Sequence, residues 1–107
     1  MRVVALEEHF TVPHLVKRID PRVIAARGFR PRRLAPGAVN PMDLAPEIGD
    51  QRIAAMDAAG ITVQVLSNTG PGPDLVAGAD GVAMAREMND HLAAAIAKRP
   101  DRFAGFA

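Results

Sequence analysis

VVALEEH, residues 3–9, joins a short apolar run rich in β-branched residues directly to two glutamates and a histidine. A nearly continuous apolar run of this length is typical of a strand that is buried on both faces, as in a parallel sheet. Because successive side chains of a strand point in opposite directions, alternation predicts two faces, one with Val3, Ala5, Glu7 and His9, the other with Val4, Leu6 and Glu8.

Further strand and helix patterns follow this first strand. In order, the sequence predicts a long Pro-rich connection, a helix, a strand, a long helix and a third strand at residues 10–47, 48–59, 61–66, 80–99 and 103–107. Gly60 stands where the C-terminal cap of the first of these helices belongs, and Asp80 is the predicted N-cap of the second. Within the connection, residues 15–27 are a candidate for a short helix, which Pro21 interrupts.

The order strand, helix, strand, helix, strand predicts an α/β fold with a parallel sheet and right-handed crossovers. Three strands leave two open sheet edges, and the 107 residues fall well short of the about 250 that a closed eight-stranded α/β barrel needs. We therefore expect residues 1–107 to be an incomplete domain, the N-terminal β-α-β-α-β part of a (β/α)8 barrel.

Composition excludes several classes of protein. Thirteen basic and twelve acidic residues give a net charge of +1, so the whole chain offers no case for nucleic acid or an anionic membrane as partner. The absence of Cys excludes a disulfide scaffold, a thiolate zinc site and a Cys nucleophile. No apolar run approaches the about 20 residues of a membrane-spanning helix, and the N-terminus does not resemble a signal peptide, so the predicted location is cytoplasmic.

The long connection has a local basic bias. Between residues 17 and 33 there are seven basic residues and a single acidic one, Asp20. Such a segment is either a solvated loop or a surface that steers anions or contacts another subunit. The sequence leaves both alternatives open.

Glu7 and His9 are the strongest candidates for functional residues. They stand at the C-terminal end of the first strand, which is the end where α/β folds bind their ligands. A carboxylate oxygen and an imidazole nitrogen are a normal ligand pair for a divalent metal, but a site needs at least one more protein ligand. The alternative is a strand end with solvated charges. Ser67 and Asn68, at the end of the second strand, are candidate substrate contacts.

The run VALEEHF at residues 4–10 resembles the N-terminal signature of the metal-dependent amidohydrolase-related family. Within that family it is most similar to the branch of γ-resorcylate and other non-oxidative aromatic acid decarboxylases. Three further stretches resemble the family in the right order, namely residues 52–61, residues 65–68 with 71–72, and residues 89–90 with 98–103 and 105–107. Together the four stretches cover most of the chain except about residues 15–47.

The resemblance implies a (β/α)8 barrel with one catalytic divalent metal, with Zn²⁺ as the first expectation and Mn²⁺ as the alternative. It implies that Glu7 and His9 are metal ligands, and that a further His and an Asp from later strands complete the site. No residue of this chain is then the catalytic acid or base. Glu rather than His at the first ligand position favours the decarboxylases over ordinary hydrolases.

The implied substrate is a small aromatic carboxylate, and the implied whole enzyme is a homo-oligomer. Two alternatives stay open at this point. The first is a metal-dependent hydrolase of an ester, lactone or amide bond. The second is a truncated, non-catalytic chain that associates through its open sheet. In either case the isolated 107 residues are expected to be inactive.

Overall fold

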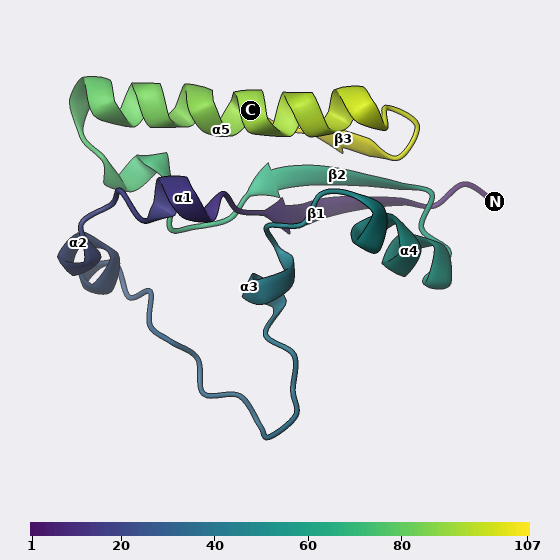
Figure 1. Cartoon of the computed structure of the whole chain (residues 1–107), viewed down its shortest axis with the longest axis horizontal. Coiled ribbons are helices and arrows are strands. Elements are labelled where there is room, and N and C mark those ends of the chain that lie inside the picture. Colours follow the sequence, from purple (N-terminus) through teal and green to yellow (C-terminus); the bar gives the residue numbers. More distant parts are fainter.

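The structure is a computed structural model that describes residues 1–107 without gaps. Its centre is a parallel three-stranded sheet in the order β1-β2-β3. The strands are β1 (Val4–Phe10), β2 (Val63–Asn68) and β3 (Phe103–Gly105). Helix α4 (Asp50–Ala58) precedes β2, and helix α5 (Gly78–Lys98) connects β2 to β3 (Figure 1). This is the predicted β-α-β-α-β order.

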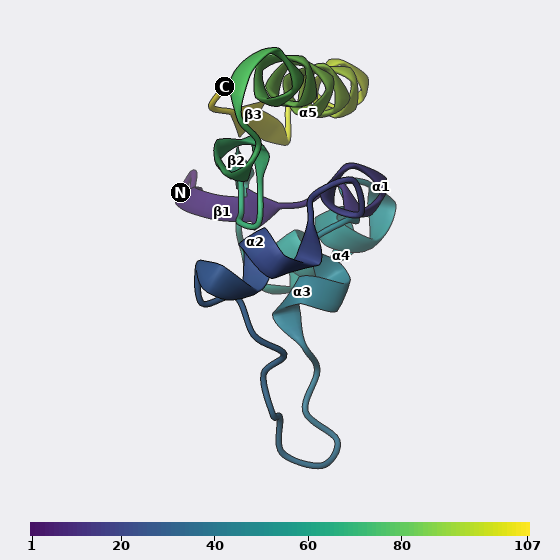
Figure 2. The ribbon, with the colours of Figure 1, turned by 90° about the vertical axis from the view of Figure 1, so that its left-hand side faces the viewer.

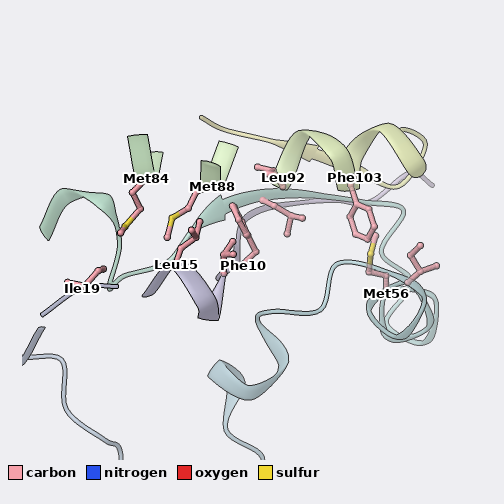
Figure 3. Packing of buried hydrophobic residues seen from close by; sticks show 11 residues of the cluster. Phe10, Leu15, Ile19, Met56, Met84, Met88, Leu92 and Phe103 are labelled. Carbon is pink, nitrogen blue, oxygen red and sulfur yellow. The ribbon is translucent and has the colours of Figure 1, made fainter. Parts of the chain in front are cut away.

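The two longer helices lie on the same side of the sheet, as Figure 2 shows when the molecule is viewed from its end. Between them and the sheet lies a single cluster of buried apolar side chains, eight of which Figure 3 labels. Its members are Phe10, Val12, Leu15, Ile19, Ile53, Met56, Leu66, Met84, Met88, Leu92 and Phe103. The other side of the sheet is more open, because Val4 and Leu6 of β1 are 45 % and 65 % exposed.

Strand β1 contains a bulge that the sequence did not predict. Ala5 pairs with Gln64, but Glu8 pairs with Leu66, so β1 has one extra residue between these pairs. Because Gln64 and Leu66 are both buried and two residues apart, Glu8 shares their face and that of Ala5. The predicted face with Val3, Ala5, Glu7 and His9 together is therefore wrong, since the bulge reverses the alternation beyond Leu6.

The connection after β1 holds three short helices, where we expected mostly irregular chain. They are α1 (Pro13–Val16), α2 (Pro21–Ala26) and α3 (Pro41–Leu44). Each begins with a proline, which is well suited to the first turn of a helix, and the side chains of Asp20 and Asn40 cap α2 and α3. Between α2 and α3 the chain makes a long excursion away from the body of the molecule (Figure 1).

Several element ends also differ from the expected ones. Strand β2 runs to Asn68, so Ser67 and Asn68 lie within the strand. Helix α5 begins at Gly78 after Ala77, and no side chain caps it; Asp80 lies in its first turn and is not the N-cap. A cap prediction from residue type alone does not detect the turn at Gly78, whose φ is +65°.

Two of the basic residues in the 17–33 segment are paired. Arg18 forms an ion pair with Glu87 of α5 at 2.8 Å, and Arg22 pairs with Asp20 at 2.9 Å. The remaining five basic residues of the segment form no ion pair. No helix in the structure has both the length and the apolar character to cross a membrane.

Gly81→Ala is expected to destabilise the chain by about 2 kcal/mol, as overpacking of a buried site does. Gly81 is buried in the first turns of α5, and a Cβ there would collide with the carbonyl oxygen of Val76. The clash outweighs the about 1 kcal/mol by which Ala is the better helix former. Urea unfolding followed by circular dichroism measures the difference, and a variant more stable than the original chain would contradict the packing.

Candidate functional site

Glu7 occupies the bulge of β1 in an unusual backbone conformation. Its φ is +61°, which makes it the only non-glycine residue of the chain in the left-handed region. Such a residue costs of order 1–3 kcal/mol, and bulges of this kind often re-aim a side chain beside an active site. Glu7 is exposed at the C-terminal half of the strand, so its carboxylate is free to bind a ligand.

His9 is held by the neighbouring strand. It pairs with Ser67 in the sheet register, and the Ser67 Oγ lies 3.3 Å from His9 Nδ1. A hydrogen bond at one ring nitrogen is what orients a metal-binding imidazole in known sites, and it leaves Nε2 available as the ligand. The pair Ser67–His9 therefore has the form of a histidine ligand with its supporting hydroxyl.

A hollow of about 440 Å³ lies beside these side chains. Glu7, Glu8 and His9 line it from β1, and residues of the α3–α4 region line the opposite wall. Arg52 of α4 also lines it, and burial lowers the pKa of its guanidinium while the carboxylates of Glu47 and Glu8 act in the opposite direction. Glu8 thus faces Arg52 without forming an ion pair, on the sheet face opposite His9.

Asn68 is not brought together with Glu7 and His9. It pairs with Phe10 in the register, so it lies on the face of the sheet that the helices cover. Its Oδ1 is buried without a hydrogen-bond partner. Its Nδ2 lies so close to Gly72 that a Cβ on that residue would stand 2.6 Å from it. Ser67 is therefore next to the candidate ligands, whereas Asn68 packs against the turn that follows β2.

The donor set suits a divalent metal but is incomplete. No group of three or more His, Cys, Asp or Glu side chains in the chain is arranged to hold a metal ion. His14 is exposed on α1 and does not join Glu7 and His9. The carboxylate of Glu7 and the imidazole of His9 can supply two ligands, so further ligands must come from outside these residues.

Two features of this site were missed by the sequence reasoning. The Ser67–His9 contact depends on the register of two strands that lie 58 residues apart in the chain, and no local pattern encodes that register. The bulge at Glu7 has no signal of its own either, because the run around it has no glycine. Its one indirect sign is that two acids directly follow a short apolar run.

Curated relatives and solved structures cover 97–100 % of this chain. The chain is 35 % identical over 105 residues to γ-resorcylate decarboxylase from Rhizobium sp. (strain MTP-10005), which covers 97 % of this chain. It superposes on the crystal structure of 2,6-dihydroxybenzoate decarboxylase from Rhizobium with a TM-score of 0.70, at 31 % identity and over 100 % of this chain. No family model matches it.

A third relative adds a metal. The chain superposes with a TM-score of 0.80, at 28 % identity and over 99 % of its length, on 5-carboxyvanillate decarboxylase from Novosphingobium aromaticivorans, which was crystallised with manganese and 4-hydroxy-3-methoxy-5-nitrobenzoic acid.

The chain is similar to an N-terminal portion of these decarboxylases. It spans only 29 % of the γ-resorcylate decarboxylase and 30–33 % of the two solved structures. The expected fold is confirmed, because these relatives are (β/α)8 barrels and the sheet seen here is part of one. Manganese in a relative agrees with the expected divalent metal, whereas the expectation of zinc finds no support.

Proposed function

We propose that this chain supplies the first two metal ligands, Glu7 and His9, of a non-oxidative decarboxylase that acts on an aromatic hydroxy acid. One observation carries the proposal: a carboxylate and a serine-supported imidazole lie at the C-terminal end of β1 in a chain 35 % identical to γ-resorcylate decarboxylase. The location at the C-terminal end of the strand is where barrel enzymes build their active sites. A hydrolase has no comparable support at this level of identity.

The residues of this chain have distinct roles in the proposal. Glu7 and His9 would hold the divalent metal, and Ser67 would keep the His9 ring oriented through Nδ1. A metal at this place supplies Lewis acidity and a template for the carboxylate and adjacent hydroxyl of the substrate. No group among these 107 residues is assigned to protonate the ring carbon, so we place that acid in a later segment of the whole enzyme.

The proposal also covers the metal ion, the substrate and the oligomeric state of the whole enzyme. We take Mn²⁺ in place of Zn²⁺, because manganese accompanies a relative of this fold. The substrate would be a small aromatic carboxylate, and the whole enzyme a homo-oligomer. Support for the homo-oligomer comes from the excursion between α2 and α3, which carries the exposed apolar side chains of Leu34 and Val39 away from the core. The cytoplasmic location stays a prediction from the sequence.

A fusion tests this function directly. The chain replaces the aligned N-terminal segment of Rhizobium γ-resorcylate decarboxylase, and CO₂ release from 2,6-dihydroxybenzoate is measured after reconstitution with Mn²⁺ or with Zn²⁺. We expect metal-dependent decarboxylation, higher with Mn²⁺, and an oligomer by light scattering. A folded fusion that binds metal but releases no CO₂ would contradict the proposal.

The isolated chain is expected to show no decarboxylation above the uncatalysed rate, even with saturating Mn²⁺. It has two of the metal ligands and no arrangement of three, and a metal held by two side chains alone lacks the fixed site that catalysis requires. The same CO₂ assay on the purified 107 residues checks this. Turnover by the isolated chain would mean that these residues contain a complete site.

A further inference from the structure

Arg52 crosses from α4 to the C-terminal end of β1. Its Nη2 donates a hydrogen bond of 3.0 Å to the backbone carbonyl of His9, and its Nη1 lies 3.3 Å from Oε1 of the buried Gln64 on β2. The guanidinium is thus bound to both strands that carry the candidate site. The two contacts lie on the same planar group, so they hold the strands in one fixed relation.

The remaining contacts of Arg52 fix it to the segment before α4. Nε donates to the carbonyl of Glu47 at 2.7 Å, and Nη2 also reaches the carbonyl of Ala45 at 3.4 Å. The Ala45 carbonyl accepts a second bond, from the backbone N–H of Thr11 just after β1. All four acceptors of the guanidinium are neutral oxygens. The guanidinium of Arg52 therefore forms no ion pair and acts through hydrogen bonds alone. We call these four hydrogen bonds the brace of Arg52.

The carboxylate of Glu47 keeps this brace in place. It accepts the backbone N–H of Arg52 at 2.7 Å, so it caps the start of α4 where Gly49 has no side chain to do so. A Cβ on Gly49 would stand 2.7 Å from that carboxylate, so glycine leaves the room that it needs. A carboxylate at a helix N-terminus is stabilised there. The brace is thus built from the backbone and side chain of Arg52 together.

We propose that Arg52 is a positioning residue that holds His9 in place as a metal ligand. His9 is restrained twice, at its backbone carbonyl by Arg52 and at its ring Nδ1 by Ser67. The first bond sets where the residue stands and the second sets how the ring is turned, which together aim Nε2. This role of Arg52 rests on the proposed function, because it has meaning only if His9 binds a metal.

Arg102 provides a matched control at the opposite end of the sheet. It precedes β3, its side chain is 14 % exposed, and it donates to the carbonyls of Thr62 and Ile61 at 2.9 and 3.2 Å and to Asp57 Oδ1 at 2.6 Å. Like Arg52, it braces a strand end by binding backbone carbonyls. Unlike Arg52, it lies at the N-terminal edge of the parallel strands, away from Glu7 and His9.

The experiment compares Arg52→Lys with Arg102→Lys in the full 107-residue chain. Lysine keeps the charge but cannot reproduce the planar fork, so each variant loses its brace. Mn²⁺ is added to ¹⁵N-labelled protein, and paramagnetic broadening of the amide signals around Glu7–His9 reports weak binding at that place. We expect the apparent Mn²⁺ affinity to fall about tenfold in Arg52→Lys, at the lower end for groups that support a metal ligand, and to stay within twofold in Arg102→Lys.

Each outcome has a distinct meaning. If the unmodified chain shows no broadening around Glu7–His9, these two side chains do not bind the metal by themselves and the positioning role is overturned, whereas the proposed function is decided separately by CO₂ release from the fusion. If the unmodified chain broadens there and Arg52→Lys broadens equally, the positioning role is overturned. Equal losses in both variants also overturn it, because both arginines then act only on stability. Should a variant unfold, all titrations are repeated in trimethylamine N-oxide, which favours the folded state.

Discussion

His9→Ala is expected to lower kcat/KM for decarboxylation about a thousandfold in the fusion with Rhizobium γ-resorcylate decarboxylase, a loss of about 4 kcal/mol in transition-state stabilisation. Removal of a ligand costs more than the 10- to 100-fold loss that follows removal of a group supporting one. Glu7→Gln is expected to act in the same direction, because a neutral amide oxygen is a poorer ligand than a carboxylate for a hard cation such as Mn²⁺.

Two neighbouring residues of the same types serve as controls. Glu8→Gln changes the adjacent glutamate, which lies on the other face of the sheet from His9, and His14→Ala removes an exposed histidine of α1. Both are expected to leave kcat/KM within about threefold, since Glu8 lies in the wall of the hollow on the face opposite His9 and His14 lies outside the hollow. Metal content measured by mass spectrometry should fall with Glu7→Gln and His9→Ala only. If Glu8→Gln lowered kcat/KM more than Glu7→Gln does, Glu8 and not Glu7 would be the metal ligand.

The choice between Glu7 and Glu8 shows where sequence reasoning succeeded and where it stopped. Strand spacing pairs Glu7 with His9, and in the structure both are exposed and line the same hollow. Strict alternation also predicts Val3 and Ala5 on the face of Glu7 and His9, which the structure does not show. One extra residue in β1 reverses the alternation, and its cause lies in the pairing with β2, which a local pattern does not contain.

The order of the main elements could be predicted because each depends on local signals. Apolar runs, the Gly60 turn and the long periodic stretch of α5 all lie within a few residues of the element that they define. The brace of Arg52 could not be predicted in the same way. Its partners are mostly backbone carbonyls at positions 9, 45 and 47. Every residue has a backbone carbonyl whatever its side chain, so the residue types at these positions give no signal. Only the fold brings those carbonyls to one guanidinium.

Phe103→Ala is expected to destabilise the chain by about 4 kcal/mol, within the range for removal of a buried phenylalanine side chain. Phe103 begins β3, is 2 % exposed and belongs to the same buried cluster as Leu92 of α5, and Figure 3 shows its ring beside Met56 of α4. It therefore connects the sheet to both long helices. Only 17 of the 107 residues are buried, so the cluster has few other side chains to compensate for the cavity.

Phe106 offers a control of the same residue type three positions later. Its side chain is 60 % exposed, so Phe106→Ala is expected to change the free energy of unfolding by less than about 0.5 kcal/mol. Urea unfolding monitored by circular dichroism compares both variants with the unmodified chain. Because small domains have only about 5–15 kcal/mol of stability, Phe103→Ala should leave a large unfolded fraction at moderate urea concentration. Equal effects of the two substitutions would show that the cluster around Phe103 does not hold α4 and α5 to the sheet.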